Sequence, residues 1–139
     1  MLRKPLENEE LLKAVERILK NFNTKAIILF GSRARGDYKP WSDYDILIIA
    51  EFNEKYLDRI AKIFELLNDI NIPIEPHPYT INEAIEMLKR GNPIIVNALS
   101  EGLMLHIKEE FKELLRLYEE LVRRGLRRTE VSIIVPEFI

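Results

Sequence analysis

The sequence predicts an α/β (α+β) domain, in which short apolar strands alternate with amphipathic helices. Two apolar runs, over residues 25–30 and 43–50, have the length and composition of buried strands. Apolar side chains recur at helical spacing before them, over about residues 7–22. With 139 residues, of which 47% are hydrophobic, the chain can bury roughly 70% of its unfolded surface. We therefore expect a single domain over residues 1–139.

Composition excludes several classes of site and partner. The chain has 21 Lys and Arg against 23 Asp and Glu, a net charge of −2, which argues against a nucleic-acid coat or a polybasic membrane binder. It has no cysteine, so disulfides, thiol catalysis and cysteine-ligated zinc are excluded, and two histidines, His77 and His106, cannot form a histidine-rich site. No apolar run approaches the ~20 residues that span a bilayer, and the N-terminus lacks the apolar stretch of a signal peptide. We expect a cytoplasmic protein with no membrane partner and no strong nucleic-acid signal.

The first half of the chain contains the two strongest strand signals. The strand over residues 25–30 ends in Gly31-Ser32. Residues 33–42 are polar and rich in turn formers, which is typical of a short helical turn followed by a loop. The strand over residues 43–50 is apolar on both faces in its second half, which predicts a central strand covered on both sides.

The middle of the chain is predicted to form a helix, an edge strand and a second helix. Asn53 is a suitable N-cap for the first helix, whose apolar stripe is Leu57, Ile60, Phe64 and Leu67. Residues 72–79 contain three prolines, which hold the chain extended and remove hydrogen-bond donors, so this segment is an expected edge strand. Thr80-Ile-Asn-Glu83 has the pattern of a capping box and begins a helix that Gly91 ends.

The last third is predicted to contain two helices, a short strand and an extended tail. Asn92-Pro93 begins a short helix that ends near Gly102, and residues 103–106 form a further short strand. Apolar spacing predicts a long C-terminal helix over about residues 108–124. The tail, about residues 129–139, has strand character but no obvious partner strand. It is therefore expected to contact another chain, either a second copy in a homo-oligomer or a different partner.

The segment that points to chemistry begins the second strand. Asp43 and Asp45 project to the same side of that strand, because residues alternate faces along a strand. Two neighbouring carboxylates repel each other unless a cation lies between them, and such hard oxygen ligands suit Mg²⁺ or Mn²⁺. The alternative is that the two aspartates merely mark the end of a strand and that Gly31-Ser32 is an ordinary turn. An unpaired charge at the head of a buried strand is costly, which favours the metal site.

Upstream residues fit a phosphate-binding role. Gly31-Ser32 follows a buried strand where a short helix can begin, so the free N–H groups and the Ser32 hydroxyl can hold a phosphate. Arg33, Arg35 and Lys39 follow and can neutralise further phosphate charge. Together with the two aspartates, this pattern indicates metal-assisted phosphoryl or nucleotidyl transfer.

These residues resemble a known family. Gly31-Ser32, ten residues, and Asp43-Tyr44-Asp45 are similar to the Gly-Ser-x10-Asp-x-Asp signature of the minimal nucleotidyltransferases, within the DNA polymerase β-like superfamily. The resemblance implies a nucleotidyltransferase fold with a small mixed β-sheet flanked by helices. It also implies a nucleoside triphosphate donor, here ATP, and two Mg²⁺ ions, with Mn²⁺ as the alternative. The implied reaction transfers a nucleoside monophosphate to a hydroxyl and releases pyrophosphate.

The family usually has a third carboxylate on a later strand, and Glu75 is the best match. The resemblance implies that Glu75 joins Asp43 and Asp45 as a metal ligand, or accepts the proton of the acceptor. Glu75 is longer than the more usual aspartate and lies among prolines, so a solvated edge-strand glutamate is the alternative. His77, two residues further on, either faces the same pocket or is a spacer in the edge strand.

Small members of the family resemble the antitoxin half of toxin–antitoxin pairs. In those pairs the antitoxin attaches AMP to a tyrosine of a HEPN-domain ribonuclease, which makes such a protein the expected partner. One alternative is a catalytically weak or inactive domain that neutralises a partner by contact. Another is a nucleotidyltransferase that acts on a small molecule such as an antibiotic.

Other conspicuous residues have plainer interpretations. His106 lies in an apolar stretch and is expected to be a core histidine with a satisfied side chain, and Tyr44 is also expected in the core. Trp41 is open to ligand or partner contact. The basic cluster over residues 123–128 complements a helix dipole, or meets an acidic partner or RNA.

Overall fold

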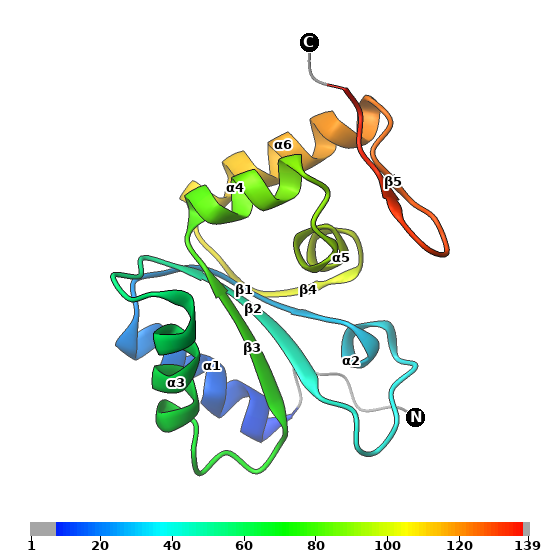
Figure 1. Ribbon diagram of the computed structural model, residues 1–139. Coiled ribbons are helices and arrows are strands. Elements are labelled where there is room, and N and C mark those ends of the chain that lie inside the picture. Colours follow the sequence, from blue (N-terminus) through cyan, green and yellow to red (C-terminus); the bar gives the residue numbers. More distant parts are fainter. Residues whose placement is uncertain (1–7, 138–139) are drawn as a thin grey trace.

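The computed structural model describes residues 8–137 (Figure 1). The first half runs through α1 (Glu9–Asn21), β1 (Thr24–Phe30), the short α2 (Ser32–Arg35), β2 (Tyr44–Ala50) and α3 (Tyr56–Leu66). The second half runs through β3 (Ile74–Tyr79), α4 (Ile81–Lys89), α5 (Pro93–Glu101), β4 (Leu103–Ile107), the 3₁₀ helix η2 (Glu109–Phe111), α6 (Lys112–Arg123), β5 (Arg127–Arg128) and β6 (Ile133–Ile134). This order of helices and strands confirms the α/β class.

The main sheet has four strands in the order β3-β2-β1-β4. β1 is antiparallel to β2 and to β4, whereas β2 and β3 are parallel, so the mixed sheet is confirmed. β3 lies at an edge as expected, because Pro76 and Pro78 have no N–H to donate and a central strand needs donors on both sides.

Helices cover both faces of this sheet (Figure 1). α1 and α3 pack on one face, against Ile46 and Ile48 of β2. α4, α5 and α6 pack on the other, against Leu47 and Ile49 of the same strand. All four isoleucine and leucine side chains are fully buried, so the expectation of a central strand covered on both sides is confirmed.

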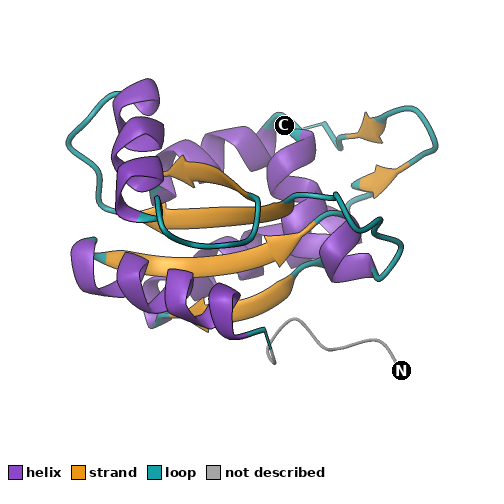
Figure 2. Ribbon diagram, turned by 90° about the horizontal axis from the view of Figure 1, so that it is seen from below, coloured by secondary structure: helices purple, strands orange, loops and turns teal. Residues whose placement is uncertain are grey.

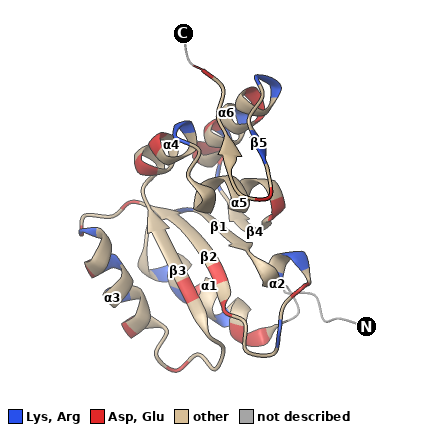
Figure 3. Ribbon diagram, turned by 45° about the vertical axis from the view of Figure 1, so that its right-hand side comes forward, with Lys and Arg blue, Asp and Glu red and all other residues tan. Residues whose placement is uncertain are grey.

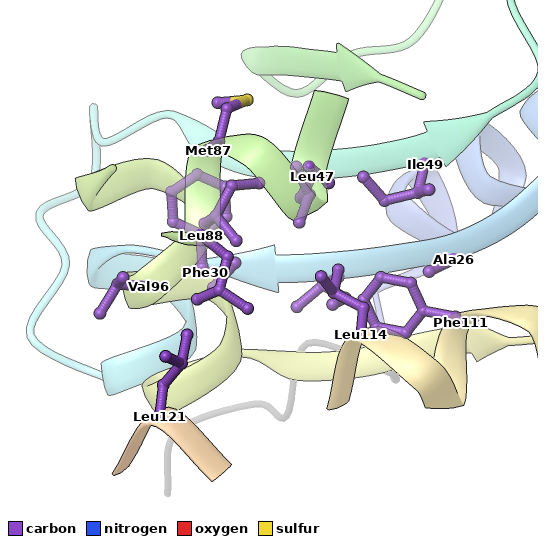
Figure 4. Close-up of a cluster of buried hydrophobic side chains, with 14 of the residues drawn as sticks. Ala26, Phe30, Leu47, Ile49, Met87, Leu88, Val96, Phe111, Leu114 and Leu121 are labelled. Carbon is purple, nitrogen blue, oxygen red and sulfur yellow. The ribbon is translucent and has the colours of Figure 1, made fainter. Parts of the chain in front are cut away.

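The larger core joins the C-terminal helix to the sheet (Figure 4). Phe111, at the end of η2, is fully buried and belongs to the same cluster as Ala26 of β1. Leu114 and Leu121 of α6 are also fully buried in this cluster. These contacts hold α6 against the domain and confirm the expected C-terminal helix, with η2 as its first turn.

Local capping signals determine where several helices begin. The Asn8 side chain accepts hydrogen bonds from the backbone N–H groups of Glu10 and Leu11, at 3.0 and 3.2 Å, which begins α1. The capping box of Thr80 and Glu83 is present at the start of α4. Both helices therefore agree with the sequence prediction, although residue 7 lies outside the described part of the chain.

The orientation of α3 differs from the prediction. Its N-cap is Lys55 rather than Asn53, and Leu57 and Phe64 of the expected buried stripe are 77% and 51% exposed. Arg59 is buried instead. Arg59 is buried because it forms a set of hydrogen bonds that the apolar spacing of a helix cannot predict. The Arg59 guanidinium donates to both carboxylate oxygens of Glu83, at 2.7 and 3.3 Å, and to the backbone oxygen of Glu54 at 2.9 Å.

We expect Glu83→Gln to lower the free energy of unfolding by about 1–2 kcal/mol at neutral pH. This value is smaller than that of a fully buried charged pair, because the Glu83 side chain is 44% exposed and water screens its charge. Glutamine preserves the capping hydrogen bond to Thr80 but leaves buried Arg59 without a counter-charge. Desolvation raises the pKa of Glu83, but hydrogen bonds from Arg59 and Thr80 outweigh it and hold the pKa below its usual value. The stabilisation is therefore complete above the unfolded pKa of about 4.3 and is lost as pH falls through the lower folded pKa.

Urea unfolding of both proteins at neutral pH and at about pH 3 measures this difference. Equal stability at neutral pH, or a difference that persists undiminished in acid, would contradict the assignment.

The tail has a strand partner within the chain. β5 and β6 form an antiparallel two-stranded hairpin, which pairs Arg127 with Ile134 and Arg128 with Ile133. Figure 2 shows this hairpin apart from the four-stranded sheet. The expectation that the tail lacks a partner strand is therefore wrong, because the partner strand β5 consists of two exposed arginines and has no apolar pattern. Contact of the tail with another chain stays a prediction, and residues 138–139 lie outside the described part.

The basic cluster is largely paired. Arg124 forms an ion pair with Glu120 of α6 at 3.0 Å, and Arg128 reaches Glu101 of α5 at 3.3 Å. Arg123 and Arg124 lie at the C-terminal end of α6, where the helix-dipole interpretation places them, and contact of the cluster with an acidic partner or RNA stays a prediction. Within residues 8–137, no helix combines the length and the apolar composition needed to cross a membrane.

Candidate active site

The candidate site lies where β2 and β3 begin side by side. In the parallel register Asp45 pairs with Glu75, and Leu47 pairs with His77. Residues paired across parallel strands point to the same face of a sheet, so all three polar side chains lie on one face. Figure 3 shows acidic segments on both strands. The ligand atoms of Asp45, Glu75 and His77 lie within 4.8 Å of one another, which is close enough to surround one metal ion.

His77 is fixed against Asp45. Its Nε2 lies 3.2 Å from Oδ1 of Asp45, its ring centroid is 5.1 Å from that of Phe30, and its side chain is 12% exposed. The buried prolines Pro76 and Pro78 hold the backbone on both sides. The sequence allows His77 to be either a site residue or a spacer, and the structure places it with Asp45 and Glu75. Its i, i+2 spacing from Glu75 on a strand was the available signal.

The carboxylates shift the protonation equilibrium of Glu75. Desolvation raises the pKa of Glu75, the negative charge of Asp45 raises it further, and His77 opposes the shift. Asp43 adds a smaller repulsion. A positive ion in the site would relieve this repulsion, which is the electrostatic signature expected of a cation site.

Asp43 occupies a different position from Asp45. It lies in the loop before Tyr44, the first residue of β2, and it is exposed. It does not belong to the close group formed by Asp45, Glu75 and His77 among the described residues. Its role as a metal ligand stays a prediction.

Gly31 brings the backbone against Asp45. It follows β1 and is the N-cap of α2, with a φ of +74° and a ψ of −160° that favour glycine. A Cβ atom at this position would lie 2.6 Å from Oδ2 of Asp45. Ser32 is the next residue and the first of α2. Because Gly31 lies against Asp45, the structure brings the Gly31-Ser32 turn and Asp45 together.

The two predicted phosphate-binding arginines are engaged elsewhere. Arg33 donates to the backbone oxygen of Ser42, at 3.2 Å from Nε and 3.0 Å from Nη2, and lies over the rings of Tyr38 and Tyr44 at 4.2 and 4.4 Å. Arg35 pairs with Asp37 in the same loop and, at 2.9 Å, with Glu101 of α5. Arg33 thus clamps the loop that carries Asp43, and its contact with phosphate stays a prediction.

We expect Arg33→Lys to loosen the loop over residues 36–43 even though it preserves the charge. Lysine lacks the planar fork that bonds Ser42 and stacks between two tyrosine rings. Backbone amide hydrogen exchange in the loop should accelerate by about tenfold, equivalent to roughly 1.4 kcal/mol of lost local stability. If amide hydrogen exchange in the loop and the affinity for ATP are both unchanged in Arg33→Lys, the charge of Arg33 alone explains its role.

The remaining residues divide between core and surface. Tyr44 is buried as expected, and its hydroxyl accepts a hydrogen bond from Asn8 Nδ2 at 3.0 Å. Trp41 is 77% exposed, so its contact with a ligand or partner stays a prediction. The expectation of a satisfied His106 is wrong: within the described residues its buried Nε2 has no hydrogen-bond partner.

Comparison with known proteins places this geometry in a family. A putative protein adenylyltransferase of Methanocaldococcus jannaschii is 39% identical over 62 residues, which are 44% of this chain and 60% of that protein. A bifunctional uridylyltransferase/uridylyl-removing enzyme of Pseudomonas entomophila is 32% identical over 76 residues, which are 53% of this chain and 8% of that enzyme. The chain therefore spans only part of the length of either relative.

Solved structures share the fold. A crystal structure of a toxin–antitoxin with AMP-PNP aligns with a TM-score of 0.54 at 17% identity, over 84% of this chain and 88% of that chain. A mutant of the toxin–antitoxin MntA-HpeT aligns with the same TM-score at 16% identity, over the same shares. The nucleotidyltransferase domain family matches residues 9–123, well over half of the sequence. The resemblance seen in the sequence is confirmed, and the chain belongs to the nucleotidyltransferase domain family.

Proposed function

We propose that this domain transfers AMP from ATP to a hydroxyl group and releases pyrophosphate. The observation that carries the proposal is the convergence of Asp45, Glu75 and the Gly31-Ser32 turn at the start of β2. A metal-binding carboxylate pair beside a turn suited to phosphate is the arrangement that this reaction needs. Membership of the nucleotidyltransferase domain family supports it.

The donor atoms present suit a divalent cation. Carboxylate oxygens of Asp45 and Glu75, with Asp43 nearby in the preceding loop, are hard ligands of the kind that Mg²⁺ and Mn²⁺ prefer. Divalent cations held there, two by family resemblance, supply neutralisation of charge on the donor phosphates. The absence of a side chain at Gly31 lets the backbone of the Gly31-Ser32 turn approach the Asp45 carboxylate, where a Cβ atom would collide with Oδ2.

The residues of the chain have separate roles in the transfer. Ser32 and the backbone N–H groups of its turn hold the terminal phosphates of the donor. The oxygen of the acceptor hydroxyl forms a bond to the α-phosphorus, the bond to the leaving pyrophosphate breaks, and the hydroxyl proton passes to Glu75. Glu75 lies beside Asp45 on the same face of the sheet, where its carboxylate can accept this proton.

A tyrosine of a HEPN-domain ribonuclease is the proposed acceptor, and the domain then acts as an antitoxin. The relative named as a putative protein adenylyltransferase supports a protein acceptor. The likeness of fold to toxin–antitoxin structures, one of them with AMP-PNP, supports both the pairing and the adenine donor. These relatives support a toxin as the partner, whereas the HEPN class of that partner comes from the family resemblance of the sequence.

The test incubates the domain with a purified HEPN-domain ribonuclease, Mg²⁺ or Mn²⁺, and ATP labelled at the α-phosphate. We expect label in the ribonuclease, a mass gain of one AMP on a tyrosine peptide, and loss of ribonuclease activity. ATP labelled at the γ-phosphate should leave no label, which distinguishes AMP transfer from phosphorylation. GTP, CTP and UTP in parallel define the base preference. An unlabelled ribonuclease under all these conditions contradicts the proposal.

Neutralisation by binding alone is the second candidate. The observation that favours it is the β5–β6 hairpin, which lies beyond the family match over residues 9–123 and carries Val131 with 93% exposure. An Asp45→Asn protein separates the two functions. Inhibition of the ribonuclease by this variant, without label transfer, supports contact, whereas loss of inhibition supports chemistry.

A further inference from the structure

One ligand atom of the candidate metal site is a nitrogen. His77 Nε2 lies 3.2 Å from Asp45 Oδ1, on the same face as Glu75. Two ligands at right angles on an ion with bonds of ~2.1 Å are about 3.0 Å apart, so this separation fits two neighbouring positions on one cation. The Glu75 carboxylate completes a group of three ligands within 4.8 Å.

The imidazole is already oriented for this role. Pro76 and Pro78 restrict the backbone of His77, and both are buried in β3. The ring packs against Phe30 and is 12% exposed, so it has little freedom to turn away. Nε2 is thereby directed at Asp45 before any cation arrives, which lowers the entropic cost of ligation.

Ligand chemistry then separates the candidate cations. Mg²⁺ prefers oxygen ligands and retains water, whereas imidazole nitrogen is an accepted ligand of transition metals, and the affinity of mixed nitrogen and oxygen sites rises along that series. We infer that His77 supplies a nitrogen ligand to the cation held by Asp45 and Glu75, and that the site therefore selects Mn²⁺ over Mg²⁺. This inference rests on the metal site of the proposed function.

Pulsed electron paramagnetic resonance of bound Mn²⁺ tests the ligation directly. Untagged protein with substoichiometric Mn²⁺, and no nucleotide, should show the ¹⁴N coupling of a directly bound imidazole. His77 and His106 are the two histidines of the sequence, so His77→Gln should abolish the coupling and His106→Gln should retain it. Absence of coupling in the wild-type protein, or its persistence in His77→Gln, overturns the inference.

Glutamine also separates ligation from hydrogen bonding. Its side-chain amide can still donate to Asp45, so a His77 that only positions Asp45 would be replaced with little loss. We expect the Kd for Mn²⁺ to rise at least about tenfold in His77→Gln while the Kd for Mg²⁺ changes by less than about threefold, both measured by calorimetry. Equal changes for the two ions overturn the selectivity. If the variant fails to fold, ¹⁵N-histidine labelling of the wild-type protein must change the nitrogen coupling.

The nitrogen coupling is measured without nucleotide, so its outcome does not depend on AMP transfer. Nitrogen coupling without AMP transfer would support the metal ligand and contradict the proposed reaction. Transfer with Mg²⁺ and no nitrogen coupling would support the reaction and contradict the role of His77.

Discussion

Asp45→Asn should lower AMP transfer by at least about 10³-fold, equivalent to roughly 4 kcal/mol of lost transition-state stabilisation. Asp45 is the residue that the other parts of the site share. It pairs with Glu75 across the sheet, contacts His77 at 3.2 Å and lies against Gly31. Asparagine preserves the size of the side chain but removes the charge that attracts a cation. Initial rates of label transfer from α-labelled ATP measure the effect.

The fold should tolerate this substitution. Neutralising Asp45 removes its repulsion of Glu75, so the pKa of Glu75 should fall and thermal stability without metal should be unchanged or slightly higher. The rise in melting temperature on adding Mn²⁺ should disappear. Asp58→Asn, at an exposed position in the first turn of α3, is the matched control and should retain both transfer and the metal response. An Asp45→Asn protein that keeps a tenth of wild-type activity would exclude Asp45 from the machinery.

Gly31→Ala should lower transfer by about 10²-fold through displacement of Asp45. The new Cβ atom would lie 2.6 Å from Oδ2 of Asp45, closer than side chains approach one another, so the carboxylate must move. The backbone conformation adds a second cost, because residues other than glycine rarely adopt a φ of +74° with a ψ of −160°. We expect the free energy of unfolding to fall by about 1–3 kcal/mol. Initial rates of label transfer measure the first effect and urea unfolding measures the second, while Mn²⁺ calorimetry reports whether Asp45 is displaced.

Gly36→Ala is the matched control for Gly31→Ala. Gly36 ends α2 with a φ of +94°, but a Cβ atom there meets no heavy atom within 4 Å. This variant therefore imposes backbone strain next to the same helix without contact with Asp45. It should lose about 1–2 kcal/mol of stability and retain its affinity for Mn²⁺. If both glycine variants lose metal binding equally, strain in α2 rather than displacement of Asp45 is the cause.

Much of the fold follows from local signals in the sequence. The apolar runs of β1 and β2 are buried strands, the prolines of residues 72–79 place β3 at an edge, and Thr80 begins α4 as its capping box predicts. The orientation of α3 could not be found in this way. Arg59 is buried because Glu83, 24 residues later in the chain, accepts its hydrogen bonds. Helical periodicity assigns a charged residue to the surface and cannot anticipate a distant partner.

The candidate site, like the fold, could be predicted from the sequence only in part. The spacing of Gly31-Ser32 and the two aspartates identifies the region, because strand alternation and the turn are properties of a short segment. Arg33 was expected to meet phosphate, since its charge is visible in the sequence. The carbonyl oxygen of Ser42 and the tyrosine rings that hold it become apparent only when the loop is folded.

Local sequence patterns were sufficient to predict the class of fold, the two central strands and the carboxylates near the start of the second of them. Three features required the folded chain: His77 joins the site, Asp43 lies outside the closest group of ligands, and the tail folds back as a hairpin. The two groups of features differ in the range of the interactions behind them. Alternation, capping and proline restrict the backbone within a few residues, whereas His77 meets Asp45 across 32 positions of sequence. That contact depends on the register in which β3 docks on β2.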